Sequence, residues 1–267
     1  MSAVHEDAVS QAIVDPTYIL GVDIGGSGMK AAIVDPLTGQ MITDRFRIPT
    51  PQPATPEAMA SVFADLVAHF AWTGPIGCTF PGVVRQKAVI ETAANLDPSW
   101  VGVDAAELFG TANTPVTMIN DADAAGVAEM RVGAGRGRDG VVFMLTIGTG
   151  FGTAIFHGGR LLPNVELGHI EIDGVDAEGH ATSRAKKAEG LSMSEWAVRL
   201  ERYIGKLEDL VSPDGFIIGG GISKDFDEFA PLLATRAELL PAQLRNHAGI
   251  VGAAMAAVTE APPRPHL

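Results

Sequence analysis

Short apolar runs alternate along this chain with longer runs of helical spacing. Residues 18–24 are largely apolar and β-branched, residues 25–28 contain only glycine and serine, and residues 31–34 are apolar again. This order predicts a strand, a glycine turn and a second strand. Residues 29–35 are too short and too β-branched to open a helix, whereas Walker and dinucleotide loops lead from a strand into a helix. The first motif is therefore a hairpin.

A glycine hairpin tip can lay backbone N–H groups against an anion, because no Cβ holds the ligand away. Asp23, at the end of the first strand, would face that anion through a bound cation. The alternative is a tight hairpin with a buried or capping Asp23. The candidate phosphate contacts here are Asp23, Gly25, Gly26, Ser27, Gly28 and Lys30.

The same pattern recurs at residues 145–158. When Thr146 is aligned with Asp23, Gly148 matches Gly25 and Ala154 matches Ala31. Such a repeat predicts two related lobes, each offering a phosphate-binding hairpin to a shared cleft. The second hairpin adds Thr146, Gly148, Thr149 and Gly150, and a third glycine segment, Gly219, Gly220 and Gly221, is a candidate for a nucleotide or phosphate tail.

Helical spacing appears after residue 55. Thr55 is suited to an N-cap and Pro56 to the first helical position, and apolar residues then recur at helical spacing to Phe70. Further helices are expected at residues 191–204, within 223–240 and at 249–258, and a third strand at 40–48.

Composition narrows the class of protein. With 267 residues, 46% of them apolar, the chain can form one large domain or two lobes. No apolar run reaches the roughly 18 residues of a membrane span. Residues 1–15 lack the pattern of a signal peptide, so we expect a cytoplasmic protein. The single Cys78 excludes an internal disulfide and a multi-cysteine zinc site.

The net charge of −13 argues against nucleic acid as a general partner. Basic residues cluster all the same. Each cluster has two interpretations, a solvated surface or a positive path that leads phosphate toward the cleft. The clusters are Arg131, Arg136 and Arg138; Arg184, Lys186 and Lys187; and Arg199, Arg202 and Lys206.

Polar residues follow several predicted strands. Asn120 and Asp121 come after the strand at 116–119, where they serve either as a helix cap or as a ligand-facing carboxylate at a strand's carboxyl end. Glu166 and His169 can both point into a pocket and bind a polyol. Gly82, in a Pro-Gly turn, and Asn95, in a polar loop, are further candidates for the same pocket.

With these motifs in order, residues 18–258 resemble the ROK (repressor, open reading frame, kinase) sugar kinases of the actin-like ATPase superfamily, and most of all their polyphosphate/ATP-dependent glucokinase and glucomannokinase branch. The motifs are Asp23-Ile24-Gly25-Gly26, Phe80-Pro81-Gly82, Asn95-Leu96, Asn120-Asp121-Ala122-Asp123, Ile147-Gly148-Thr149-Gly150-Phe151-Gly152, Glu166-Leu167-Gly168-His169 and Gly219-Gly220-Gly221.

The resemblance implies an α/β, actin-like (ribonuclease H-like) fold with two lobes of mixed sheet and helices around a central cleft. Residues 1–16 would be a loose tail, 17–119 the N-terminal lobe completed by a helix at 247–259, and 120–246 the C-terminal lobe.

The resemblance also implies an activity, the transfer of a terminal phosphoryl group from polyphosphate or ATP to the 6-hydroxyl of glucose or mannose. Asp121 would be the base, Asp23 would hold Mg²⁺ directly or through water, and Gly82, Asn95, Asn120, Asp121, Glu166 and His169 would bind the sugar.

Two departures from the family pattern matter. Residues 170–187 contain no cysteine, so we expect no zinc. The first loop reads Gly-Gly-Ser-Gly-Met-Lys rather than the common Gly-Gly-Thr-Lys, which leaves the role of Lys30 open and looks like the polyphosphate-using branch.

A winged helix before the first hairpin would need about 60 or more residues, so a DNA-binding repressor is not expected. A non-catalytic actin-like scaffold and a sugar-sensing regulator remain as alternatives. The choice between ATP and polyphosphate, between glucose and mannose, and between monomer and homodimer stays open at this point.

Overall fold

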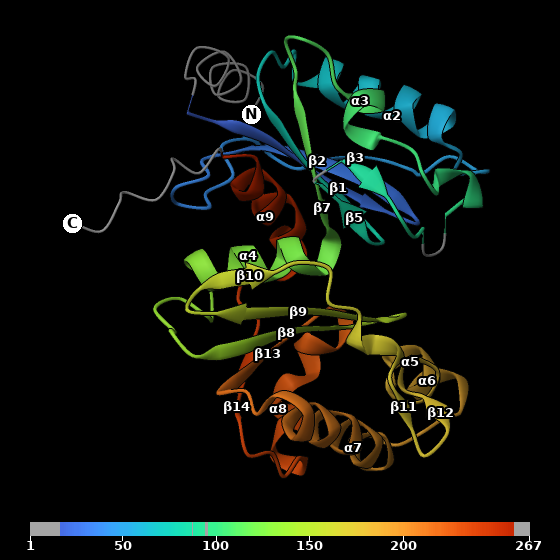
Figure 1. Cartoon of the computed structure of the whole chain (residues 1–267), viewed down its shortest axis with the longest axis vertical. Coiled ribbons are helices and arrows are strands. Elements are labelled where there is room, and N and C mark those ends of the chain that lie inside the picture. Colours follow the sequence, from blue (N-terminus) through green and yellow to red (C-terminus); the bar gives the residue numbers. More distant parts are fainter. Residues whose placement is uncertain (1–16, 87, 94–95, 259–267) are drawn as a thin grey trace. The chain divides into compact units, whose positions relative to one another are not determined.

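The computed structural model describes residues 17–86, 88–93 and 96–258 (Figure 1). Their packing divides them into two units. Unit 1 takes in the described residues up to Ala124 and those from Gly249 onward, and unit 2 runs from Ala125 to Ala248.

Unit 1 is built on a five-stranded sheet of order β3-β2-β1-β4-β7. β1 pairs with β2 and β2 with β3 in antiparallel fashion, whereas β1–β4 and β4–β7 are parallel. The predicted first hairpin is therefore confirmed. The strands are β1 (Ile19–Gly25), β2 (Gly28–Val34), β3 (Phe46–Ile48), β4 (Ile76–Phe80) and β7 (Val116–Asn120).

Helices cover both faces of this sheet. Alternate side chains of β1, such as Leu20 and Val22, pack in one core with α2 (Pro56–His69) and α3 (Ala105–Phe109). Helix α9 (Ala248–Ala257) lies on the opposite face (Figure 1). A short ribbon of β5 (Val84–Arg85) and β6 (Val89–Ile90) and the turn η1 (Pro98–Trp100) complete the unit.

Helix α9 approaches the sheet at two glycines. A Cβ on Gly21 would lie 2.2 Å from the carbonyl oxygen of Ile250, and a Cβ on Gly77 would lie 1.8 Å from that of Ala253. Only glycine permits such contact between backbones. Because side chains alternate along a strand, Asp23 on β1 faces the same side as Gly21 and therefore lies on the α9 face.

Unit 2 repeats this topology, with a sheet of order β10-β9-β8-β13-β14. Two antiparallel pairs are again followed by two parallel pairs. The predicted internal repeat and the second hairpin are confirmed. The strands are β8 (Val141–Ile147), β9 (Phe151–His157), β10 (Arg160–Leu162), β13 (Gly215–Gly219) and β14 (Glu238–Pro241).

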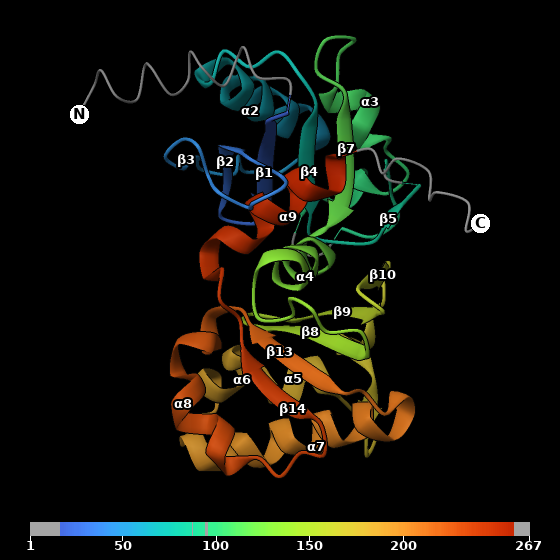
Figure 2. The ribbon, with the colours of Figure 1, turned by 90° about the vertical axis from the view of Figure 1, so that its left-hand side faces the viewer.

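One face of the second sheet packs on α7 (Met193–Val211), whose apolar residues Trp196, Leu200 and Tyr203 join the core as predicted. The other face meets α4 (Asp121–Val132), which begins in unit 1 and continues in unit 2. Figure 2 shows α4 and α7 on opposite sides of β8 and β13.

The remaining elements of unit 2 are short. They are η2 (Leu167–His169), β11 (Glu171–Ile172), β12 (Val175–Asp176), α5 (Ala177–Ala181) and α6 (Ser183–Ala188), followed by η3 (Gly221–Asp225), α8 (Phe226–Phe229), η4 (Ala230–Leu232) and η5 (Arg245–His247).

The structure corrects two expected elements. The strand expected at 40–48 is regular only at Phe46–Ile48, because the hydroxyl of the buried Thr43 accepts a hydrogen bond from the backbone N–H of Ile33. The helix expected within 223–240 is limited to short turns and α8, since Pro231 interrupts the segment and β14 follows. Within the described residues, no helix has the length and apolar character needed to cross a membrane.

Candidate active site

The first hairpin ends in a turn that carries almost no side chains. Gly25 and Gly28 are the last pair of the β1–β2 ladder, and Gly26 and Ser27 between them are exposed. The hydroxyl of Thr50 donates to the carbonyl oxygen of Gly25 at 2.5 Å, which fixes one side of the turn. The turn can therefore present backbone groups to an anion, as the sequence predicts.

Asp23 is held by two neighbours. Its Oδ2 lies 3.0 Å from Nζ of Lys30, and its Oδ1 accepts from Oγ1 of Thr79 at 3.0 Å. The same Thr79 oxygen accepts from the backbone N–H of Ile24. Sequence reasoning missed Thr79, whose only signal is a hydroxyl at the end of a buried strand.

Asn120 and Asp121 begin helix α4. The side-chain oxygen of Asn120 accepts from the N–H groups of Ala122 at 2.8 Å and Asp123 at 3.0 Å, so the capping interpretation of Asn120 is correct. Its amide nitrogen donates to the carbonyl oxygen of Gly82 at 3.0 Å. Asn120 therefore joins the Pro-Gly turn to the helix start, whereas Asp121 is exposed.

Gly82 is required by its surroundings. A Cβ at this position would lie 2.0 Å from the carbonyl oxygen of Thr92, so the chain passes close to the turn. The structure thus brings Gly82, Asn120 and Asp121 together in unit 1. The predicted sugar contact Asn95 lies outside the described residues.

The second hairpin lies beside the third glycine segment, within unit 2. Gly148 donates to the carbonyl oxygen of Gly150 at 3.0 Å and accepts from the backbone N–H of Arg184. Gly220 has φ of +77°, and a Cβ there would lie 2.6 Å from the backbone of Ile147. Of the predicted residues, Thr146 pairs with Gly219, and Gly148 lies near Gly221. Thr149 and Gly150 follow Gly148 in the same turn.

His169 makes a hydrogen bond through Nδ1 to Oδ2 of Asp176 at 3.0 Å. This bond, with the negative charges of Glu178 and Glu166, raises the pKa of His169 above its ordinary value, against the opposing effect of burial. Burial raises the pKa of the Glu166 carboxyl, a shift that His169 opposes and Glu178 reinforces. The pKa values of Glu166 and His169 therefore depend on the same small group of charges.

Glu178 connects this group to the second hairpin. Its Oε2 accepts from the backbone N–H of Phe151 at 3.0 Å and lies 3.8 Å from Nε2 of His169. A Cβ on Gly150 would lie 2.6 Å from the same oxygen. Asp176 and Glu178 were not expected from the sequence; the signal that could have found them is an acidic pair shortly after His169.

Partly buried hydrogen bonds hold this cluster in place. The N–H of Leu167 donates to Oγ1 of Thr153 at 3.0 Å, and the hydroxyl of Tyr203 donates to the carbonyl oxygen of Leu167. Tyr203 also stacks on Phe151, with ring centroids 4.4 Å apart. The segment that carries Glu166 and His169 is thereby tied to both the hairpin and α7.

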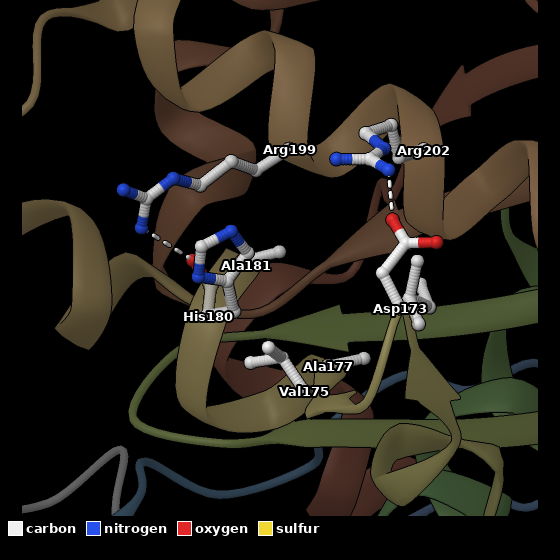
Figure 3. Close-up of a pocket in the computed structure, with 8 residues that line it drawn as sticks. Asp173, Val175, Ala177, His180, Ala181, Arg199 and Arg202 are labelled. Atoms are coloured by element: carbon white, nitrogen blue, oxygen red, sulfur yellow. Dashed lines mark hydrogen bonds and ion pairs between the residues drawn. The ribbon is translucent and has the colours of Figure 1, made fainter.

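A separate cavity of about 80 Å³ lies between α7, α5 and the β11–β12 ribbon (Figure 3). Arg199 donates there to the carbonyl oxygen of His180 and pairs with Glu189, and Arg202 pairs with Asp173. None of the predicted site residues lines this cavity, and it is far smaller than the roughly 300 Å³ of a typical ligand pocket. Because each arginine forms an ion pair with a carboxylate, this basic cluster is better interpreted as solvated surface than as a positive path for phosphate.

The candidate metal ligand of the first hairpin is the carboxylate of Asp23. Among the residues that the structure describes, no group of three or more His, Cys, Asp and Glu side chains is arranged to hold a metal. Asp23 nevertheless fits Mg²⁺, which usually takes one or two carboxylates together with waters and substrate phosphates. Each oxygen of Asp23 has one contact named above and retains capacity to accept another.

The chain is similar to known proteins in both sequence and fold. The polyphosphate glucokinase of Mycobacterium tuberculosis is 49% identical over 242 residues, which cover 90% of this chain and 91% of that protein. The crystal structure of the inorganic polyphosphate/ATP-glucomannokinase from Arthrobacter sp. strain KM has a TM-score of 0.81 and 51% identity, and covers 90% of this chain and 97% of that one.

A ROK family glucokinase from Streptomyces griseus, solved with glucose and AMPPNP, has a TM-score of 0.74 and 27% identity, and covers 90% of this chain and 99% of that one. These neighbours confirm the predicted actin-like ATPase fold. The ROK family itself matches residues 19–186, more than half of the chain. On its sequence motifs, its repeated topology and these matches, the chain belongs to the ROK family.

Proposed function

We propose that this chain moves a terminal phosphoryl group from inorganic polyphosphate or ATP to the 6-hydroxyl of glucose. The relatives named for this activity share about half of their residues with the chain over nearly its whole length. Mannose differs from glucose only in the configuration of one hydroxyl and belongs to the proposal as a second acceptor. The observation that carries the proposal is the exposed carboxylate of Asp121 at the start of α4. Asn120 joins this helix start to the turn at Gly82.

In the proposed reaction Asp121 accepts the proton of the 6-hydroxyl while that oxygen attacks the terminal phosphorus. The bond between phosphorus and the bridging oxygen breaks, and its electron pair leaves with the shortened donor. An ordinary Asp is a weak base, so Asp121 acts mainly by orienting the hydroxyl in line and taking the proton late. Gly82, Asn95, Asn120, Glu166 and His169 are proposed to bind the other hydroxyls.

Glu166 and His169 suit a polyol for chemical reasons. An ionised carboxylate accepts hydrogen bonds, and a protonated imidazole donates them, so the pair offers both kinds of contact. Glu178 adds a second carboxylate beside His169. We include Glu178 among the proposed sugar contacts because it lies in this group and borders the second hairpin.

The donor is proposed to bind along the glycine hairpins. Their backbone N–H groups and the hydroxyls of Ser27, Thr146 and Thr149 can hydrogen-bond phosphate oxygens. Mg²⁺, when bound, neutralises charge on the donor phosphates. Asp23 would hold it, through water where Lys30 retains its ion pair, and the segment Gly219–Gly221 would border the distal part of the donor.

The test is to incubate the protein with Mg²⁺ and either ATP or polyphosphate against glucose, mannose, galactose and xylose, and to identify the products by ³¹P NMR. We expect glucose 6-phosphate, and no product from xylose, which has no 6-hydroxyl. Donor hydrolysis that is indifferent to sugar would point instead to an actin-like ATPase scaffold. Glucose binding without any phosphoryl transfer would point to a sugar-sensing regulator.

A further inference from the structure

The guanidinium of Arg47 reaches the tip of the first hairpin. The residue itself belongs to β3, directly opposite Lys30 of the neighbouring β2. Its Nη2 donates to the carbonyl oxygen of Ser27 at 2.5 Å. Residues directly opposite each other in an antiparallel pair project to the same face. Arg47 therefore shares the face of Lys30 and of its partner Asp23.

Gly28 makes room for this arginine. A Cβ at Gly28 would lie 2.4 Å from Nε of Arg47 and 2.6 Å from both Cζ and Nη2. Any side chain at position 28 would therefore push the guanidinium away from the turn. Gly28 is also part of the segment in which the first loop departs from the common Gly-Gly-Thr-Lys pattern, so this departure has a physical consequence.

The charge of Arg47 is available to a ligand. The positive charge of Lys30 is compensated by Asp23, whose Oδ2 lies 3.0 Å from the Lys30 Nζ. Among the described residues, no acidic side chain pairs with Arg47. Arg47 is exposed, and its guanidinium retains N–H donors beyond the one directed to Ser27. In a chain of net charge −13, an uncompensated cation beside a turn of bare backbone is suited to an anion.

We propose that Arg47 is a donor-binding residue, whose guanidinium contacts the phosphate chain of the donor where that chain passes the tip of the first hairpin. This inference rests on the proposed function, since it assigns the ligand of the hairpin. The competing view is that Arg47 only braces the turn through Ser27. A brace and a phosphate contact differ in how donor binding responds to salt.

The experiment compares Arg47→Ala, Arg47→Lys and Gly28→Ala with the wild type, and uses Arg45→Ala, the loss of a nearby exposed arginine, as the control. For Arg47→Ala we expect the KM for polyphosphate to rise about tenfold, the order expected for one hydrogen bond to a charged group. The KM for glucose and the kcat should stay within about twofold, since only donor binding is affected. Arg47→Lys should recover part of the loss, and Arg45→Ala should match the wild type.

Two further readouts separate contact from brace. The dependence of the polyphosphate KM on salt concentration should become shallower in Arg47→Ala, because one charge contact to the donor is lost. Gly28→Ala should reproduce the rise in KM by displacing the guanidinium, and Gly28→Ala combined with Arg47→Ala should be no worse than either alone. An unchanged donor KM, an unchanged salt dependence or additive effects would overturn the proposal.

Direct binding keeps this test independent of the proposed reaction. Calorimetry with inorganic tripolyphosphate, in the absence of sugar, should show weaker binding to Arg47→Ala than to the wild type. If the wild type makes no sugar phosphate, the proposed function fails while this comparison still decides the role of Arg47. Equal affinity of both proteins for tripolyphosphate would reject Arg47 as a donor-binding residue.

Discussion

At the scale of single residues, the hydrogen bond between His169 and Asp176 affects the pH at which His169, a proposed sugar contact, changes charge. Because this bond raises the pKa of His169, the stability that it contributes is fully present below about pH 6.5 and is lost as pH rises through the raised pKa. The side chains are 61% and 48% exposed, so solvent screens the pair and the contribution is small. The protonation state of His169 is the more informative quantity.

We expect Asp176→Asn to lower the pKa of His169 toward its ordinary value, because asparagine removes the negative partner but still caps α5 through Gly179. An NMR titration of the His169 ring protons measures this directly. Asp173→Asn is the matched control, since Asp173 pairs with Arg202. Identical His169 titration curves in the wild type and Asp176→Asn would show that the bond does not set the pKa.

At the scale of elements, the contact between α9 and the first sheet depends on glycine. Gly77→Ala would place a methyl group 1.8 Å from the carbonyl oxygen of Ala253, which neither backbone can avoid without moving. We expect the free energy of unfolding to fall by about 1–3 kcal/mol or more, as for other overpacked cores. The shift in urea midpoint at an unchanged m-value measures this loss.

Gly205→Ala provides the matched control. Gly205 lies within α7, and a Cβ there would meet no atom within 4 Å. Replacing a glycine inside a helix by alanine stabilises by about 0.5–1 kcal/mol. The same chemical change should therefore destabilise at position 77 and stabilise at position 205, and shifts of the same sign at both positions would contradict this interpretation of α9 packing.

The elements differ in how far the sequence predicts them. Both hairpins are encoded locally, by apolar runs that flank glycines, and the structure confirms them. The contact of Thr79 with Asp23 joins residues 56 positions apart, and that of Glu178 with Phe151 joins residues 27 apart. Such partners are set by strand order and by the path of the β11–β12 segment, which no local pattern reveals.

At the scale of the whole molecule, the chain leaves unit 1 within α4 and returns to it with α9. Helix α9 buries Ile250, Val251 and Met255 almost completely. Full burial of each such side chain contributes about 1.5–3 kcal/mol, so their sum approaches the total stability of a typical domain. Unit 1 therefore depends on the last described helix of the chain.

We expect a chain that ends at Ala248 to lose the native structure of unit 1 while unit 2 persists. The tryptophans report on this separately, because Trp72 and Trp100 lie in unit 1 and Trp196 in unit 2, all buried. Two variants of the truncated chain would keep either Trp196 alone or only Trp72 and Trp100. The fluorescence emission should shift to the red only in the variant that keeps Trp72 and Trp100. Native-like emission from Trp72 and Trp100 in the truncated chain would refute this dependence.

The proposed reaction depends on the carboxylate of Asp121, and its most direct test is the turnover of Asp121→Asn with glucose and either donor. Loss of a general base typically costs about 10²–10⁴-fold in rate, and we predict a fall of that order in kcat. The glucose Kd from calorimetry should stay close to that of the wild type, and Asp44→Asn, an exposed aspartate of the same unit, should leave kcat unchanged. Turnover of Asp121→Asn near the wild-type rate would contradict the proposed mechanism.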